Sequence, residues 1–231
     1  MTPFDPFLSR RGFLGGALAL GTTAVAPWFS RRGAFAAELM KTPSVTEGPF
    51  YPDKLPLDTD NDLLVINDKI TPAVGDITHL MGVIRDTDGT PMKGLTIEIW
   101  QVDNGGAYIH SGTGNKDKQD RNFQGFGRFT TDKSGAYYFR TIKPVPYPGR
   151  TPHIHYKVKR GNRELLTSQI MISGHEQNAR DGVLRSAGGL LEQELMMAEF
   201  KPIKDSKIGE LEAKFDIVLG KTPDENAGRR R

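Results

Sequence analysis

The stretch HIHYKVKRGNRELLTSQIMI, residues 153–172, decides the fold of this 231-residue chain. Side chains alternate from His153 to Arg160 and again from Glu164 to Ile172, and Gly161-Asn162 separates the two runs. A period of two is typical of half-buried strands, and a short Gly-Asn connection joins two such strands into a hairpin. The stretch therefore predicts a pair of antiparallel strands.

The same alternation recurs along most of the chain, and helical periodicity is scarce. About seven strands are expected, which predicts an all-β fold, an antiparallel β-sandwich with long loops. A short C-terminal helix is expected over Leu190 to Phe200, because Leu190, Leu191, Leu195 and Met196 share one helical face. The other predicted strands are Ile77 to Arg85, Leu95 to Gln101, Gly127 to Thr131, Ala136 to Thr141 and Glu212 to Leu219.

The first 36 residues read as an export signal. Arg10-Arg11 forms a twin-arginine pair before an apolar run from Gly15 to Ala26, and Ala34-Phe35-Ala36 offers a cleavage site. The apolar run is shorter than the roughly 20 residues that cross a bilayer, so no stable membrane span is expected. We expect a periplasmic or secreted protein that uses the twin-arginine export machinery.

Composition narrows the possible functions further. The leader carries four arginines and one aspartate, so its removal lowers the formal charge from +3 to zero. A neutral chain lacks the electrostatic footprint of a nucleic-acid-binding protein. Because the chain has no cysteine, it forms no disulfides, and any metal site must use His, Tyr, Asp or Glu.

His153 and His155 are the first candidate metal ligands. Two positions apart on a strand, both imidazoles project from one face while Ile154 points to the other. Such a pair alone is more often a surface or packing feature. The proline-rich loop that carries Tyr147 leads directly into it, and Tyr108 follows a Gly105-Gly106 turn.

Motifs around these four side chains resemble those of the intradiol ring-cleavage dioxygenases, which include the protocatechuate and catechol dioxygenases. The resemblance covers roughly Thr46 to Gly174. Its motifs are Gly106-Ala107-Tyr108, Gly127-Arg128-Phe129, Thr131-Asp132, Gly135-Ala136-Tyr137, Thr141-Ile142, Tyr147-Pro148, Arg150 and His153-Ile154-His155.

The resemblance implies a prealbumin-like sandwich that holds a mononuclear, non-haem Fe(III) centre. Tyr108 and His153 would be the retained metal ligands, Tyr147 would leave the metal when substrate binds, and His155 would lie opposite it. Phenolate is a hard anionic donor suited to a trivalent cation, whereas Fe(II) would favour carboxylate ligands. The implied reaction is intradiol cleavage of a catechol by O2 to a muconate-type dicarboxylate.

The resemblance also assigns residues around the metal. Arg150 would stabilise negative charge on the ring, and Gln169 would hydrogen-bond in the pocket or order Arg150. Glu47 and Phe50, within the Thr46 to Pro52 motif, are candidate pocket walls. His79, His110 and His175 fall outside the pattern and are expected to be structural or solvent-facing.

These inferences divide the chain into four parts. Residues 1–36 form the signal peptide, 37–76 an extended segment lining the site, 77–221 the catalytic sandwich and 222–231 a flexible tail. Two features depart from the better-known enzymes: only five residues separate Tyr147 from His153, and a helical N-terminal domain is absent. The particular catechol and the oligomeric state therefore stay open.

Two other functions compete with the enzyme. One is a non-catalytic exported β-sandwich for adhesion or carbohydrate binding, because Gly82 to Gly94 and Thr131 to Phe139 resemble prealbumin-like repeats of such modules. The other is a metal-binding protein without turnover. A binding module has no need for all four candidate ligands, which favours the enzyme.

Overall fold

The computed structural model describes residues 38–66 and 71–220. The expected signal peptide and the expected flexible tail lie outside these residues. The strands are β1 Ile77–Asp86, β2 Thr96–Trp100, β3 Phe126–Thr130, β4 Ala136–Ile142, β5 His153–Arg160, β6 Arg163–Ile172, β7 Met197–Ala198, β8 Phe200–Pro202, β9 Leu211–Lys214 and β10 Ile217–Leu219. The helices are η1 Lys116–Lys118, η2 Glu176–Arg180, α1 Gly182–Ser186 and α2 Leu190–Glu194.

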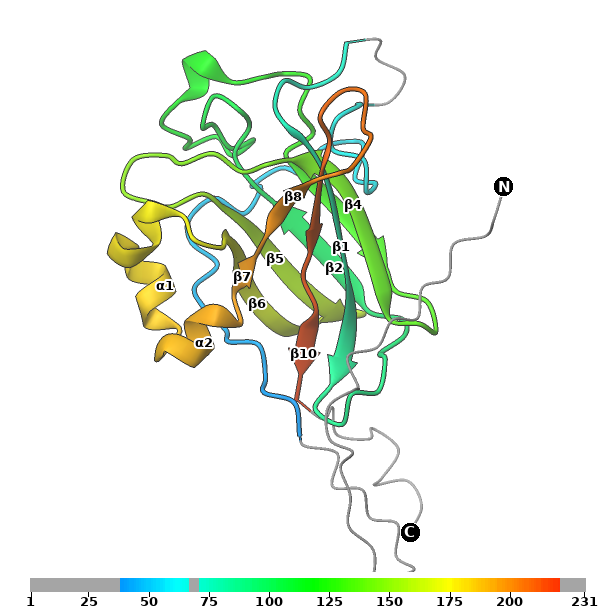
Figure 1. The fold of residues 1–231 in the computed structure, drawn as a ribbon. Helices are drawn as coiled ribbons and strands as arrows, with labels where there is room; N and C mark the ends of the chain where they lie inside the picture. The colour runs from blue at the N-terminus through cyan, green and yellow to red at the C-terminus, as the bar shows by residue number, and fades with distance from the viewer. Residues whose placement is uncertain (1–37, 67–70, 221–231) are drawn as a thin grey trace, which may run out of the picture. The chain divides into compact units, whose positions relative to one another are not determined.

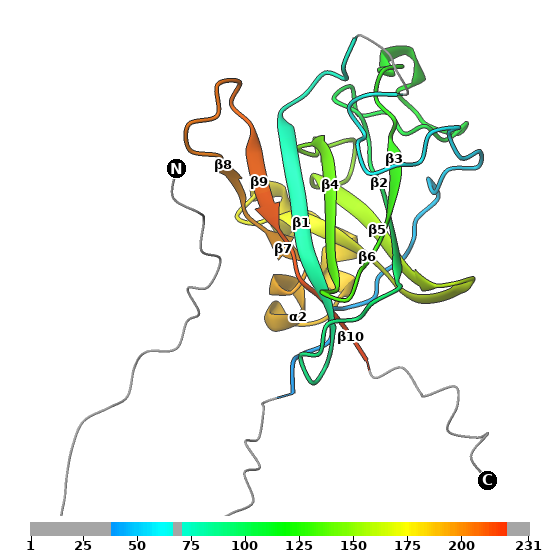
Figure 2. The same ribbon diagram turned by 90° about the vertical axis from the view of Figure 1, so that its right-hand side faces the viewer.

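The strands form two sheets, which confirms the predicted sandwich (Figure 1). One sheet has the order β3-β2-β5-β6-β7; in the other, β1 pairs with β4 on one edge and with β9 and β10 on the other, and β8 pairs with β9. Figure 2 shows β1 and β4 side by side in one layer. Most pairs are antiparallel, but β9 and β10 run parallel to β1, and β7 runs parallel to β6.

Side-chain hydrogen bonds interrupt the last predicted strand. The sequence predicted one strand from Glu212 to Leu219, but the structure divides it into β9 and β10 at Phe215 and Asp216. The Val83 N–H of β1 donates to Asp216 Oδ1 (2.8 Å), and the Tyr137 hydroxyl donates to the Phe215 carbonyl oxygen, so side chains replace backbone partners at this point. Ala213, Phe215, Ile217 and Leu219 are all buried, as the alternation predicted.

The core between the sheets takes alternate side chains from each strand. Ile154 and Tyr156 of β5 pack there with Leu80 of β1 and Phe139 of β4, and all four are fully buried. Because strand side chains alternate, His153 and His155 must lie on the opposite, outer face of the β2-β5-β6 sheet. The core therefore positions the imidazoles.

The predicted helix from Leu190 to Phe200 is confirmed only over its first five residues, Leu190–Glu194. Helix α2 ends at Glu194, and the chain then becomes extended because Met197 and Ala198 pair with the edge of β6. Leu190 and Leu191 are 82% and 67% exposed, so only Met196 of the predicted packing face is fully buried. Tertiary pairing has overridden a local helical pattern.

Residues 38–66 contain no helix and no strand. They are tied to the sandwich by backbone hydrogen bonds, including Val45 N–H to Thr167 O (3.1 Å) and Leu63 N–H to Arg140 O (2.8 Å). Part of this segment covers the outer face beside His155. None of the described helices is long and apolar enough to cross a membrane.

A pair of leucine truncations tests this packing. Leu80→Ala should lower the free energy of unfolding by about 2–5 kcal/mol, because it leaves a cavity in the core, whereas Leu190→Ala should change it by less than about 0.5 kcal/mol. Urea unfolding of the metal-free protein measures both. Equal losses would contradict the exposed position of Leu190.

Candidate metal centre

The register of β5 places one aromatic ring and one side-chain amide beside His155. Trp100 of β2 and Gln169 of β6 are its cross-strand partners. The Trp100 and His155 rings stack with centroids 4.9 Å apart and planes 10° apart. This stack fixes the plane of the imidazole and therefore the direction of its nitrogen atoms.

The backbone fixes the tautomer of His153. Its Nδ1 lies 2.6 Å from the Thr151 carbonyl oxygen, which can only accept a hydrogen bond. Nδ1 therefore carries the proton, and Nε2 keeps its lone pair for a metal ion. The Nε2 atoms of His153 and His155 lie 3.1 Å apart, so both imidazoles point to one place.

Tyr108 completes a triangle of donor atoms. Its phenol oxygen lies 3.3 Å from His153 Nε2 and 3.0 Å from His155 Nε2. The side chain is buried, and the Phe50 ring stacks on it with centroids 4.9 Å apart. The loop that carries it is held by the Gln119 amide, which donates to the Tyr108 carbonyl oxygen (3.1 Å).

Tyr147 lies at the more open side of this triangle. Its ring centroid is 5.6 Å from that of Tyr108 and 5.5 Å from that of His153, and the side chain is only partly buried. A turn closed by the Arg150 N–H to the Tyr147 carbonyl oxygen (3.0 Å) sets its position. All four side chains that the sequence singled out are therefore neighbours.

The donor triangle has dimensions that suit a transition-metal ion. Donor atoms about 2.1 Å from a common ion and at right angles to each other lie about 3.0 Å apart, which is close to the separations seen here. His155 Nδ1 is buried without a hydrogen-bond partner among the described residues. Those residues contain no group of three His, Asp or Glu side chains fit to hold a metal, so the phenols are essential to the donor set.

Burial keeps the donors uncharged in the metal-free protein. Desolvation and the nearby Arg150 guanidinium lower the pKa of His153 to about 3, and desolvation with His153 lowers the pKa of His155 well below its usual value. Burial and the neighbouring Tyr147 raise the pKa of Tyr108 well above 10. Imidazoles that stay neutral suit a cation, and the Tyr108 phenol ionises only if a strong Lewis acid binds it.

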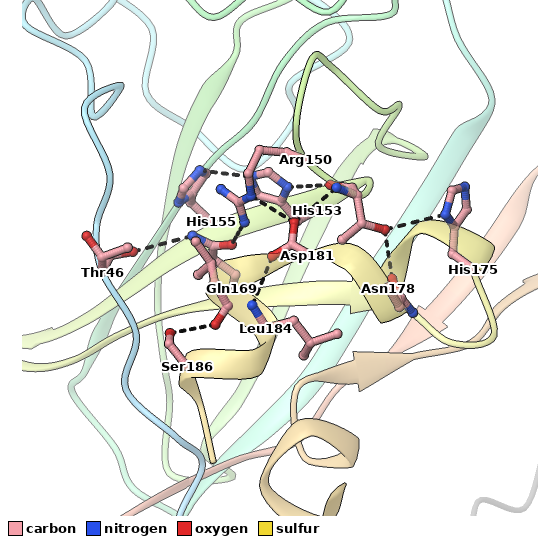
Figure 3. A network of polar contacts seen from close by, with 12 residues as sticks. Thr46, Arg150, His153, His155, Gln169, His175, Asn178, Asp181, Leu184 and Ser186 are labelled. Carbon is pink, nitrogen blue, oxygen red and sulfur yellow. Dashed lines mark hydrogen bonds and ion pairs between the residues drawn. The ribbon is translucent and has the colours of Figure 1, made fainter. Parts of the chain in front are cut away.

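Arg150 is held beside the ligands by two partners (Figure 3). Its Nε donates to Asp181 Oδ2 (2.8 Å) and its Nη2 donates to Gln169 Oε1 (2.5 Å). The Gln169 amide donates in turn to the Thr46 carbonyl oxygen (3.3 Å), which ties residues 38–66 to the same network. Of the two roles suggested for Gln169, the geometry matches the ordering of Arg150.

Asp181 is the main site residue that the sequence reasoning missed. Burial would raise the pKa of its carboxyl, but the hydrogen bonds from Arg150 and from the backbone of Leu184 outweigh this effect, so the pKa lies below its usual value. Asp181 is also the N-cap of α1. The one available signal was a capping residue before Gly182-Val183-Leu184, and the predicted helix was placed further along the chain.

A second polar cluster holds part of residues 38–66 against the outer face of the β2-β5-β6 sheet. The buried Glu98 carboxylate accepts hydrogen bonds from Tyr51 (3.0 Å), Arg128 (3.2 Å) and Lys159 (2.7 Å). Glu47 forms an ion pair with Lys157 of β5, so it also anchors this segment to the sheet. Phe50 lies against the Tyr108 ring and forms a wall of the site.

The remaining histidines lie outside the donor triangle. His79 hydrogen-bonds Tyr138 (2.6 Å) and Glu210 (3.2 Å). His110 accepts from the Gly112 backbone, and its ring edge meets Phe50. His175 accepts from the Gln177 N–H at the start of η2. These contacts are structural, as the sequence predicted.

Comparison with known proteins finds similarity to dioxygenases. Residues 46–221 match a family described as Dioxygenase. The chain is 31% identical over 170 residues to the protocatechuate 3,4-dioxygenase beta chain of Burkholderia cepacia, covering 69% of this chain and 71% of that one. It is 27% identical over 201 residues to hydroxyquinol 1,2-dioxygenase of Corynebacterium glutamicum, covering 77% of this chain but only 63% of that relative.

Solved structures with a similar fold are also known. One is the dioxygenase domain of a dioxygenase and carbohydrate-binding protein fusion from Streptomyces sp. SirexAA-E. It superimposes with a TM-score of 0.60 at 27% identity, covering 79% of this chain and 100% of that chain.

The neutral imidazoles predict how pH affects stability. Unfolded histidines bind protons near pH 6.5, whereas folded His153 does so only near pH 3. The unfolded state therefore binds more protons in this window, so the free energy of unfolding should fall as pH drops from about 6.5 towards 3. Urea titrations of the metal-free protein measure this slope, which should be smaller in His153→Gln. An unchanged slope would contradict the burial argument.

Proposed function

We propose that this chain, which belongs to the intradiol ring-cleavage dioxygenase family, cleaves a catechol-type aromatic with O2 at a mononuclear Fe(III) centre. The ligands would be Tyr108, Tyr147, His153 and His155. The observation that carries the proposal is the triangle of the Tyr108 oxygen and the two Nε2 atoms, with sides of 3.0–3.3 Å.

The donor set favours iron in its ferric state. Two phenolates and two neutral imidazoles would leave a trivalent ion with one positive charge, and hard anionic oxygen donors suit such a cation. Ferric iron, when bound, supplies the Lewis acidity that lets the phenols and the substrate ionise near neutral pH. Zn(II) and Mg(II) provide less of this acidity, and Fe(II) favours carboxylates.

The two tyrosines would have different tasks. Tyr108 is buried under Phe50 and suits a permanent ligand, whereas Tyr147 is partly exposed on a loop and suits a ligand that moves. On substrate binding, the Tyr147 phenolate would accept a proton from one catechol hydroxyl. O2 would then insert between the two hydroxylated carbons. Hydrolysis would give a muconate-type dicarboxylate that contains both oxygen atoms of the O2 molecule.

Arg150 would stabilise the negative charge that develops on the ring. Its guanidinium is close enough to lower the pKa of both His153 and His155, and its side chain is only 16% exposed. A fixed cation in a largely buried place stabilises developing charge more than a mobile one in water. Gln169 and Asp181 fix it.

Substrate choice stays with the catechol class. The relatives named above act, by their names, on protocatechuate and hydroxyquinol, which both carry two hydroxyls on adjacent ring carbons. The connection between Tyr147 and His153 is short, which supports a wide opening to the candidate site. Larger or plant-derived catechols are therefore suitable substrates to assay. A metal-binding protein without turnover is the competing reading, and product analysis separates the two.

Iron loading and tyrosine replacement test the proposal. Iron-loaded wild type should absorb in the visible through its bound tyrosinates, and catechol should shift the band. Tyr108→Phe should lose most of the band and at least about 100-fold in kcat/KM, and His155→Ala should retain less iron. Tyr138→Phe, at a tyrosine outside the centre, is the matched control.

Three results would count against it. A colourless iron-loaded wild type would exclude the tyrosinate ligands. A coloured protein that converts none of a panel of catechols would favour metal binding without turnover. Equal losses in Tyr108→Phe and Tyr138→Phe would remove the special role of Tyr108.

We also infer that residues 1–36 direct export through the twin-arginine pathway. The support is the Arg10-Arg11 pair and the apolar run after it. The full chain should reach the periplasm of a bacterial host, and replacement of both arginines by lysine should retain it in the cytoplasm. Cell fractionation measures this, and unchanged export of the lysine variant would contradict the signal.

A further inference from the structure

Three hydrogen bonds connect the carboxylate of Asp181 to the candidate centre and to the segments that support it. Asp181 has a fully buried side chain between η2 and α1. Its Oδ2 accepts from Arg150 Nε (2.8 Å) and from the Thr151 backbone N–H (3.1 Å), and its Oδ1 accepts from the Leu184 N–H (2.9 Å). One side chain thus joins a helix start, a cation and the loop before β5.

The bond to Thr151 extends the influence of Asp181 to a candidate metal ligand. The Thr151 carbonyl oxygen accepts the Nδ1 proton of His153 and so decides which nitrogen faces the metal. The Thr151 hydroxyl donates to Asn178 Oδ1 (2.7 Å), and the Asn178 amide donates to the Ile172 carbonyl oxygen (2.9 Å). Residue 151 is therefore held at its N–H by Asp181 and at its hydroxyl by Asn178.

If the contact with Asp181 is lost, the Arg150 guanidinium can turn into a neighbouring surface pocket. A surface pocket of about 250 Å³ is lined by Gly149, Arg150, Thr151, Gln177, Arg180 and Asp181. A guanidinium without a buried carboxylate partner gains hydration by turning into such a pocket. The contact between Asp181 and Arg150 opposes that movement and keeps the cation beside Gln169 and the imidazoles.

We propose that Asp181 is a positioning residue for ring cleavage: it orients the Arg150 guanidinium and holds the Thr151 backbone that sets the His153 tautomer. This inference rests on the proposed function. Asp181 does not touch the reacting atoms, so its effect must pass through Arg150 and Thr151. Since Arg150 would act on charge that develops during the reaction, loss of Asp181 should appear in kcat more than in KM.

Asp181→Asn is the first test, and Asp62→Asn is its matched control. Asp62 also accepts from a backbone N–H, that of Leu64 (3.0 Å), and from an arginine, Arg140 (2.9 Å), but it lies outside the candidate centre. With iron-loaded protein and catechol, Asp181→Asn should lower kcat by about 10- to 100-fold with little change in KM. Asp62→Asn should change kcat by less than about two-fold.

A second measurement needs neither iron nor turnover. In metal-free protein labelled with ¹⁵N-arginine, the Arg150 Nε–H should give a signal protected from exchange with water, assigned by its absence in Arg150→Lys. Asp181→Asn should remove this protection, and Asp62→Asn should leave it intact. If Asp181→Asn does not fold, Asp181→Ser retains a helix-capping oxygen while losing the reach to Arg150.

A double-variant comparison separates positioning from a general loss of structure. If Asp181 acts mainly through Arg150, Asp181→Asn should cost no more than about two-fold when added to Arg150→Ala. Wild-type kcat together with a protected Arg150 Nε–H in Asp181→Asn would overturn the inference and leave the proposed function standing. If wild type cleaves no catechol, the proposed function fails, and the exchange measurement still decides whether Asp181 orients Arg150.

Discussion

The candidate centre depends on the two-residue period of β5. Ile154 and Tyr156 are fully buried in the core, so His153 and His155 are forced onto the outer face of the sheet. A slip of one residue would exchange the two sets and would place imidazoles in an apolar core. The packing that stabilises the sandwich therefore also fixes the positions of the two histidines.

The donor atoms of Tyr108, His153 and His155 on the outer face are also buried, but their surroundings are polar and open on the side of Tyr147. Phe50, Trp100 and the backbone before β5 enclose the donor atoms, and burial keeps the two imidazoles neutral. Buried polar atoms that lack adequate partners are costly to the folded state. A cation bound at the donor triangle would satisfy them together, which links the stability of this face to the chemistry that it supports.

The sequence predicted the features that repeat locally, and it predicted less well those that depend on distant contacts. Strands such as β5 follow from alternation, and the Tyr108, Tyr147 and histidine set follows from short motifs. The end of α2 at Glu194 is decided by pairing with β6, and the break between β9 and β10 by hydrogen bonds in which the Asp216 and Tyr137 side chains take part. Asp181 reaches Arg150 from 31 residues away, and no local pattern marks that contact.

The most direct test of the account is a crystal structure of the iron-loaded protein, with the ion located by anomalous scattering at the iron edge. The account predicts a single strong peak within bonding distance of the Tyr108 oxygen and of both Nε2 atoms, with Tyr147 as a further ligand before substrate binds. An iron peak elsewhere, with Tyr108, His153 and His155 still bonded only to each other, would contradict it.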